Sequence, residues 1–345
     1  MKLLTTISVI LFLSFSTLLS DEWERVENLR GYWKFSIGDD KDWSKPEYND
    51  SDWEEIIVPS TWEDQGFHGY NGYAWYRKEF KLAMNGLNSI LYLQLGYIDD
   101  ADEVYLNGKL IGKSGGFPPR FETAYNAFRK YPIPQNLLSE NGRNLISVRV
   151  YDSQLGGGIV SGDIGIFMRY YEVKPVLNLE GEWKFRINDN DDWKETNFDD
   201  SNWDEIVVPG FWETQGYEEY NGFAWYRKTF TVPSKLTKEK LVMLLGKIDD
   251  IDEAYLNGVQ IGVTGDMYDD PFYISFDQEY NEFRGYYIPE NLIKPGSNVI
   301  AVRVYDGFRD GGIYEGPIGL IEQDDYVKFW RSKKKRNIWE LIFGN

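Results

Sequence analysis

Residues 29–35 read Leu-Arg-Gly-Tyr-Trp-Lys-Phe, and residues 179–185 read Leu-Glu-Gly-Glu-Trp-Lys-Phe. The two stretches lie 150 positions apart (179 − 29), and the same shift superimposes the Tyr-Arg-Lys triplets at 76–78 and 226–228. A shift held over so long a segment indicates two copies of one structural unit. The tryptophans paired by this shift are Trp33 with Trp183, Trp43 with Trp193, Trp53 with Trp203, Trp62 with Trp212 and Trp75 with Trp225.

The local pattern within each copy is that of β-strands. The Asn-Gly dipeptides at 107–108 and 257–258 each lie between two short β-rich runs, which is the strongest short-range signal for a hairpin. Ile146, Val148 and Val150 alternate with more polar neighbours, as expected of a half-buried strand. We therefore predict an all-β protein of two tandem antiparallel β-sandwich domains. Their expected bounds are residues 21–173 and 176–325, followed by a basic and aromatic C-terminal tail at 326–345.

The two ends of the chain differ from the repeat in composition. Residues 1–20 join an early Lys2 to an apolar run that ends in a small residue, which predicts a signal peptide and export to the periplasm or beyond. An uncleaved anchor is the alternative. The tail combines basic residues with Trp and Phe, so it is either a docked or frayed end or a contact with a membrane surface or a partner.

Charge and composition exclude several classes of function. The formal net charge of −19 disfavours binding to nucleic acid, because an acidic surface repels phosphates. The absence of cysteine excludes disulfides, thiol nucleophiles and cysteine metal sites. Stability must come from burial alone, and about 150 residues suffice for a core in each domain.

An ordered set of residues, named at the end of this paragraph, resembles the jelly-roll, galactose-binding-like domain of glycoside hydrolase family 2. The second copy is also similar to the jelly-roll modules of bacterial sialate O-acetylesterases, through Trp225-Tyr-Arg-Lys228 and residues 245–258, 298–306 and 311–313. The resemblance implies a sugar-binding module. It is carried by Trp33, Val58-Pro59, Trp62, Gly66, Asn71-Gly72, Trp75-Tyr76-Arg77, Asp102, Asn107-Gly108, Gly112, Arg129, Pro134, Asn144 and Asp152.

A complete catalytic apparatus is not expected. The catalytic carboxylates of family 2 lie on a separate barrel of about 250 residues, and only the tail follows residue 320. His68, the sole histidine, is replaced by Glu218 in the second copy, so a Ser-His-Asp site is disfavoured. The pairs Asp99-Asp100 and Asp249-Asp250 precede a hairpin strand, where alternation argues against a joint acid and base role. A turn role or weak Ca²⁺ binding is the better interpretation, and we predict no catalytic residue, resident metal or cofactor.

Sugar binding requires an exposed aromatic face bordered by Asp, Asn or Arg. Trp62 and Trp75 flank a Gly- and Asn-rich loop, as Trp212 and Trp225 do in the second copy, so these four either form a binding face or clamp the loop to the sandwich. The loop at 115–124 differs from its counterpart at 265–279, which indicates that the copies differ in ligand or that only one binds. The candidate carbohydrate-binding residues are Trp62, Asn71, Trp75, Arg120, Asp152, Trp212, Asn221, Trp225, Tyr268 and Asp306.

Arg129 and Arg284 precede extended runs and are either buried ion-pair partners of nearby aspartates or exposed readers of a sugar carboxylate. Together these patterns predict an exported, non-catalytic carbohydrate-binding or accessory protein that contacts a glycan or a partner hydrolase. The alternatives are a divergent family 2 or acetylesterase-like hydrolase and a structural envelope protein.

Overall fold

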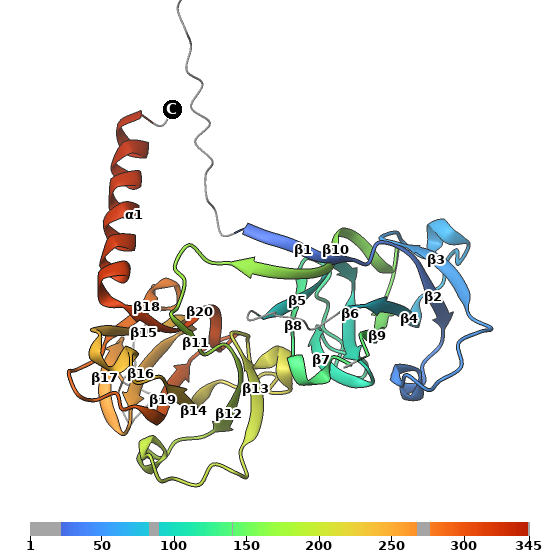
Figure 1. Ribbon diagram of the computed structural model, residues 1–345. Helices are drawn as coiled ribbons and strands as arrows, with labels where there is room; N and C mark the ends of the chain where they lie inside the picture. Colours follow the sequence, from blue (N-terminus) through green and yellow to red (C-terminus); the bar gives the residue numbers. More distant parts are fainter. Residues whose placement is uncertain (1–21, 83–89, 140, 268–276, 344–345) are drawn as a thin grey trace, which may run out of the picture.

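The computed structural model describes residues 22–82, 90–139, 141–267 and 277–343 of the 345-residue chain. Two β-sandwiches lie side by side, and a single long helix projects from the second (Figure 1). The all-β class and the two tandem antiparallel sandwiches are confirmed. The segments predicted as a signal peptide, residues 1–20, lie outside the described residues.

The first module packs a four-stranded sheet on a six-stranded sheet, and all strand pairs are antiparallel. The four-stranded sheet has the order β1 (Glu22–Asn28), β10 (Gly158–Tyr170), β5 (Leu91–Asp99) and β8 (Phe128–Ile133). The six-stranded sheet has the order β3 (Glu54–Val58), β2 (Gly31–Ile37), β4 (Gly72–Lys81), β9 (Arg143–Asp152), β6 (Ala101–Leu106) and β7 (Lys109–Ser114).

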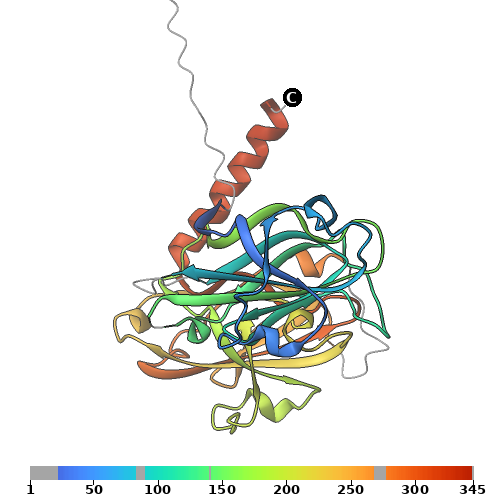
Figure 2. The same cartoon turned by 90° about the vertical axis from the view of Figure 1, so that its right-hand side faces the viewer.

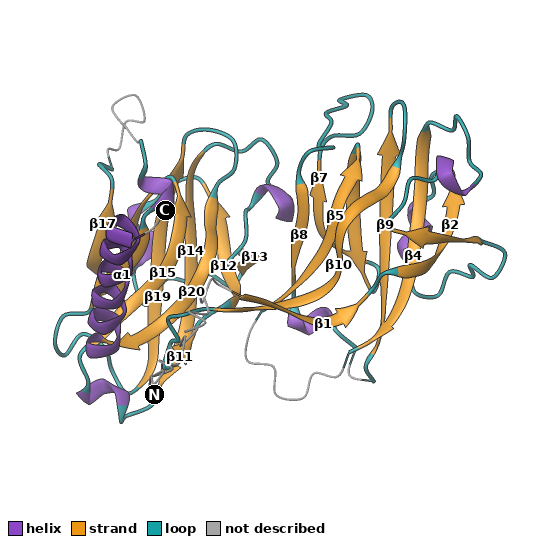
Figure 3. Cartoon of the chain, turned by 90° about the horizontal axis from the view of Figure 1, so that it is seen from above, coloured by secondary structure: helices purple, strands orange, loops and turns teal. Residues whose placement is uncertain are grey.

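The second module repeats this arrangement (Figure 3). Its smaller sheet has the order β11 (Leu177–Asn178), β20 (Gly312–Glu322), β15 (Leu241–Asp249) and β18 (Phe283–Tyr287). Its larger sheet has the order β13 (Asp204–Val208), β12 (Gly181–Ile187), β14 (Gly222–Val232), β19 (Gly296–Asp306), β16 (Ile251–Leu256) and β17 (Val259–Thr264).

The hairpin turns and the alternation of side chains follow the sequence prediction. Asn107 and Gly108 both have positive φ, 49° and 82°, which is the conformation that a two-residue type I′ hairpin requires. Asn257 and Gly258 repeat it at 51° and 80°. Val148 and Val150 point between the sheets into the first core, whereas Arg149 points outward. The predicted alternation is therefore confirmed, but the strand is buried on both faces rather than half-buried, because Ser147 and Arg149 on the outer face are also buried.

An irregular segment, residues 38–53, covers the outer face of the six-stranded sheet in the first module. Its Trp43 and Trp53 rings meet edge to face at 5.0 Å, and Trp43 also contacts Trp75 of β4. Arg77, two positions beyond Trp75 on the same outer face of β4, donates to Asp50 at 2.7 Å and to the carbonyl of Lys45. This second apolar layer adds a core outside the sandwich and accounts for part of the 17% aromatic content of the chain.

The two modules share a mixed apolar and charged interface. Ile90 and Tyr92 of the first module pack against Val207 of the second. Ion pairs also bridge the modules, between Lys113 and Glu218 at 2.6 Å and between Arg169 and Glu315 at 3.2 Å. The modules are thus in direct contact rather than only tethered by the linker.

Glu180, which follows the linker, makes the stability of the chain depend on pH. Burial raises the pKa of Glu180 to about 7 from an ordinary value of 4.5, despite a hydrogen bond to Tyr171. Between these two pH values the folded chain keeps a proton that the unfolded chain has released. We therefore expect the contribution of Glu180 to stability to fall as the pH rises from about 4.5 through about 7. Melting curves of the full chain against pH should lose part of this slope in Glu180→Gln and keep it in Glu79→Gln, which changes an exposed acid.

The tail forms helix α1 (Gln323–Phe343), so the predicted boundary at residue 326 falls inside this helix. Tyr326 is buried against Val173, Val242 and Leu244, and this contact fixes the start of the helix on the second module. The rest of α1 extends away from the sandwiches (Figure 2). Within the described residues, no helix combines the length and apolar character needed to cross a membrane.

Candidate functional site

Three aspartates that are distant in sequence meet at one end of the first sandwich. Strand β5 ends at Asp99, Asp100 follows it, and strand β9 ends at Asp152. One carboxylate oxygen from each lies within 4.8 Å of the others. Glu63 of the adjacent 3₁₀ turn (Glu63–Gln65) is close enough to raise the pKa of both Asp99 and Asp152. We call Glu63, Asp99, Asp100 and Asp152 acidic cluster 1.

The members of acidic cluster 1 differ in how well their oxygens are satisfied. Asp100 accepts hydrogen bonds from the hydroxyl of Thr123 at 2.5 Å and from the backbone and hydroxyl of Ser153 at 2.9 and 2.8 Å. Asp152 is fully buried, and its Oδ1 accepts only from the backbone of Gln154 at 3.2 Å. Among the described residues, Asp152 Oδ2 and Glu63 Oε1 are buried without a hydrogen-bond partner. Such atoms are costly unless something else satisfies them.

The pKa values follow from this difference. Burial, and then the neighbouring Asp100 carboxylate, raise the pKa of Asp99 to about 6. Burial, together with the charges of Asp99, Asp100 and Glu63, raises the pKa of Asp152 to about 7. Burial also disfavours the charged form of Asp100, but its hydrogen bonds from Thr123 and Ser153 outweigh that effect and lower its pKa. Near neutral pH the site holds a proton or attracts a cation.

The second module carries the same arrangement, acidic cluster 2, which is made of Glu213, Asp249, Asp250 and Asp306. The oxygens of the three aspartates again lie within 4.8 Å of one another. Asp306 Oδ2 and Glu213 Oε1 are the buried atoms without a partner among the described residues. Burial is the main cause that raises the pKa of Glu213 to about 9 and that of Asp249 to about 8.

The argument from strand alternation against a joint role of Asp99 and Asp100 is wrong. Alternation holds only within a strand, and β5 ends at Asp99, so Asp100 lies in the bend before β6. The bend turns both carboxylates toward the end of β9. Sequence reasoning did not include Glu63, Asp99 or Asp100 among the candidate binding residues. The signal that points to them is the repetition of each acid in the second copy, as Glu213, Asp249 and Asp250.

Aromatic side chains form a ledge beside acidic cluster 1, on the outer face of the larger sheet. Tyr73 and Phe117 are parallel, with ring centroids 6.0 Å apart and an interplanar angle of 7°. The guanidinium of Arg149 lies 4.6 and 4.4 Å from these two rings and donates to Asp39 at 2.7 Å. Phe121 is 41% exposed and contacts Tyr151. We call Tyr73, Phe117, Phe121 and Tyr151 the aromatic ledge; sequence reasoning did not single out these residues.

The expected tryptophan binding face is wrong. Trp62, Trp75, Trp212 and Trp225 are all 0% exposed and cannot stack on a ligand. Trp62 donates to the carbonyl of Tyr70 and belongs to the core between the sheets. Trp75 does point outward, as alternation predicts, but residues 38–53 cover it. The alternative that these residues hold the loops in place is the one observed, and Trp212 and Trp225 repeat it.

Of the other candidate residues, three are exposed polar side chains, two are buried aspartates and one lies outside the described residues. Asn71 is exposed next to Gly72, which pairs with Asp152, and Asn221 lies equivalently beside Gly222 and Asp306. Arg120 is exposed on the loop between Phe117 and Phe121. Asp152 and Asp306 are in the acidic clusters but fully buried, so neither reaches a sugar directly. Tyr268 lies outside the described residues.

The structure also locates Arg129, Arg284 and His68, which the sequence analysis considered for other roles. Arg129 and Asp102 form a fully buried ion pair at 2.7 Å, and Arg284 and Asp252 form its counterpart at 2.8 Å. The structural role considered for both arginines is therefore the one observed. His68 is exposed on its loop.

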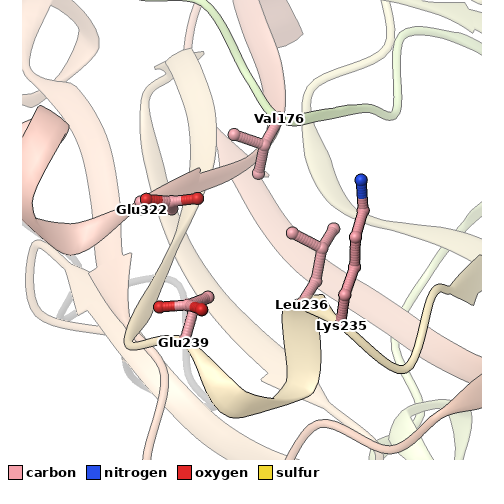
Figure 4. A pocket seen from close by; sticks show the side chains of 5 residues that line it. All are labelled: Val176, Lys235, Leu236, Glu239 and Glu322. Atoms are coloured by element: carbon pink, nitrogen blue, oxygen red, sulfur yellow. The ribbon is translucent and has the colours of Figure 1, made fainter.

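A cavity of 330 Å³ lies near the linker, well apart from the residues above. Val176, Lys235, Leu236, Glu239 and Glu322 line it, with the two glutamates on one side and Lys235 and Leu236 on the other (Figure 4). It contains no aromatic side chain and no predicted binding residue. It lacks the stacking surface that a sugar site needs.

Comparison with known proteins relates the first module to sugar-cleaving enzymes. Residues 38–155 match the family model described as the β-galactosidase second all-β domain. A putative β-glucuronidase of Formosa agariphila is 32% identical over 157 residues, which cover 42% of this chain and 14% of that protein. The resemblance to family 2 glycoside hydrolases is confirmed. The likeness to sialate O-acetylesterases stays a prediction.

The chain is also similar to more distant proteins. A β-galactosidase of Thermoanaerobacter pseudethanolicus is 26% identical over 172 residues, which cover 45% of this chain and 22% of that protein. β-Glucuronidase 2 of Bacteroides uniformis is a solved structure with 15% identity and a TM-score of 0.36, covering 86% of this chain and 28% of that one. The chain therefore spans less than a quarter of the length of the Formosa β-glucuronidase and of the Thermoanaerobacter β-galactosidase.

Proposed function

We propose that this family 2-related chain is an exported, non-catalytic carbohydrate-binding or accessory protein of saccharide processing, and that the aromatic ledge of the first module is its glycan contact. The observation that carries the proposal is the partly exposed ledge at the same end of the sandwich as acidic cluster 1. Aromatic faces bind the C–H faces of sugar rings, and bordering polar groups pair with hydroxyls. Arg120 and Asn71 supply exposed polar groups at this end.

Preorganisation of the ledge supports this role. Arg149 lies against both Tyr73 and Phe117 and is fixed there by its ion pairs with Asp39 and Glu103, so the rings are held before a ligand arrives. A rigid contact surface loses less conformational entropy on binding. The matching face of the second module has Arg303 over Phe223, but Phe223 is only 9% exposed. We therefore assign the stronger binding to the first module.

Hydrolysis is the second candidate, and the close carboxylates of the acidic clusters favour it. A glycosidase uses one carboxylic acid of raised pKa as general acid and a second, ionised carboxylate as base or nucleophile, and acidic cluster 1 holds acids of both kinds, with the pKa of Asp99 raised and that of Asp100 lowered. Against this, Asp152 and Asp306 are fully buried behind Trp62 and Trp212, where a glycosidic bond does not reach them. Burial of the acids supports binding over turnover. Activity on aryl β-glucuronides or β-galactosides that survives purification and disappears in Asp99→Asn would favour the hydrolase instead.

A glycan array followed by titration of the best ligand tests the ledge. We expect Phe121→Ala and Tyr151→Ala each to weaken binding by about 1–3 kcal/mol, the range known for stacking of planar ligands and an upper guide for a sugar. The fold should be retained in Phe121→Ala because this side chain is already 41% exposed.

Tyr32→Ala is the matched control, because Tyr32 is 63% exposed on β2 and outside the ledge. It should leave glycan affinity unchanged. Equal affinity of the native chain and both ledge variants would show that the ledge is not the contact. Titration of a partner hydrolase from the same system, with the same variants, tests the docking role.

A further inference from the structure

We propose that each module holds a divalent cation, best matched by Ca²⁺, at its acidic cluster. The ligands are Asp99, Asp100 and Asp152 in the first module and Asp249, Asp250 and Asp306 in the second. The proposal is independent of the glycan contact, because it concerns the space between the sheets rather than the ledge.

The spacing of the oxygens fits a calcium ion. In each cluster, one oxygen from each of the three aspartates lies within 4.8 Å of the others. Calcium binds oxygen at about 2.3–2.6 Å, so two ligands on opposite sides of the ion are at most about 5 Å apart. Magnesium binds at about 2.0–2.1 Å and retains several waters, which a site this buried does not accommodate.

The buried oxygens without partners are the second, independent observation. Asp152 and Asp306 are 0% exposed, and the Oδ2 atom of each has no hydrogen-bond partner among the described residues. Each belongs to a group of three carboxylates whose candidate ligand oxygens lie within 4.8 Å of one another. A buried carboxylate needs a cation or donors to remain charged, and a shared ion provides this for all three at once.

Direct ion pairs with basic side chains do not compensate the charge of the described aspartates in either cluster. Within the described ranges, no lysine or arginine forms an ion pair with any of the six aspartates. Arg129 and Arg284 lie nearby, but their guanidinium groups are paired with Asp102 and Asp252 and with backbone carbonyls. No direct ion pair among the described residues therefore competes with a small cation for these carboxylates.

The two copies agree in the ligands while their surroundings differ. In the first module Ser153 donates to Asp100 through both its backbone and its hydroxyl, whereas in the second the equivalent donor is the backbone of Gly307. Glu63 and Glu213 occupy the same place, each accepting from the backbone of a glycine, Gly157 or Gly311. Their second oxygens, Oε1, are also without partners among the described residues and offer a further ligand.

Terbium luminescence and thermal melting of the full chain test the proposal. Tb³⁺ is a Ca²⁺-like probe, and Trp62 and Trp212 are placed to sensitise it, because each ring lies against the glycine that borders Asp152 or Asp306. We expect about two ions per native chain, released by Ca²⁺, and a melting temperature that rises with CaCl₂ and falls with EDTA. Asp152→Asn and Asp306→Asn should each remove one ion, and the double variant should lose at least tenfold in affinity.

Asp52→Asn, at an exposed acid outside both clusters, is the control and should bind as the native chain does. If Asp152→Asn fails to fold, Asp99→Asn and Asp249→Asn at the half-buried edge of each cluster replace it. Absence of binding up to about 1 mM, the weak limit of extracellular calcium modules, overturns the proposal. Undiminished binding by the double variant also overturns it. A third outcome also overturns the proposal: Asp152→Asn is more stable than the native chain, and neither CaCl₂ nor EDTA changes the melting temperature. In that case a shared proton, and not an ion, satisfies the cluster.

Discussion

Arg129→Met is expected to lower the free energy of unfolding of the first module by about 3–5 kcal/mol, the cost of removing one partner from a buried ion pair. Both Arg129 and Asp102 have fully buried side chains, and they are joined at 2.7 Å. Methionine fills similar volume but leaves the Asp102 carboxylate without its cation. Burial already raises the pKa of Asp102, and without Arg129 the side-chain donor that remains to it is the neutral hydroxyl of Tyr131.

The arginine also joins three segments of backbone. It donates to the carbonyls of Ala124, Ala127 and Asp100, and Tyr131 donates to the second oxygen of Asp102 at 2.6 Å. The network therefore fixes the loop before β8 to the end of β5. Arg284 makes the same set of bonds in the second module, so Arg284→Met should destabilise that module by a similar amount.

Chemical denaturation of the full chain, followed by tryptophan fluorescence, measures both losses. Arg25→Met is the matched control, because Arg25 and Asp163 pair at 2.6 Å with side chains 38% and 55% exposed. Such exposed pairs contribute about 0–1 kcal/mol. Asp102→Leu combined with Arg129→Met should recover much of the lost stability, because no buried charge is then left unpaired. A loss for Arg129→Met no larger than for Arg25→Met would contradict a structural role.

Local signals were sufficient to predict the fold. The hairpin turns depend on two residues, Asn107 and Gly108, whose preference for positive φ is intrinsic. The core strands depend on alternation over a few positions, as in Ile146, Val148 and Val150. Because the chain contains two copies of the unit, each hairpin and each alternating strand was predicted from two separate stretches of sequence.

The candidate site was harder to predict because it depends on long-range contacts. Asp99 and Asp152 are brought together only when β5 and β9 end at the same edge of the sandwich, and no local pattern states this. Trp75 does lie on the outer face of β4, but no local pattern shows that residues 38–53 fold back over that face. The ledge rings lie on β4, β9 and a loop, so they become neighbours only through the sheet.

Trp62→Ala is expected to cost about 3–5 kcal/mol of stability, the usual range for truncating a buried tryptophan. The Trp62 side chain is 0% exposed and contacts Phe35 and Tyr70. It fills a space that only a glycine opposite permits, since a Cβ at Gly157 would lie 2.2 Å from the Trp62 ring. Removing the ring leaves a cavity beside Asp152 and deprives the Tyr70 carbonyl of its donor.

Thermal melting and glycan titration of the same samples separate packing from binding. Trp330→Ala is the matched control, because Trp330 is 39% exposed on α1 and its truncation opens no cavity in either sandwich. Glycan affinity, corrected for the folded fraction, should be unchanged in Trp62→Ala if the aromatic ledge is the contact. If Trp62→Ala keeps the native melting temperature but loses glycan affinity, Trp62 is instead part of the binding face, because a ring that contributes nothing to packing must be exposed in solution. Trp212→Ala should follow Trp62→Ala in stability, because the second module buries its tryptophan against Gly311 in the same way.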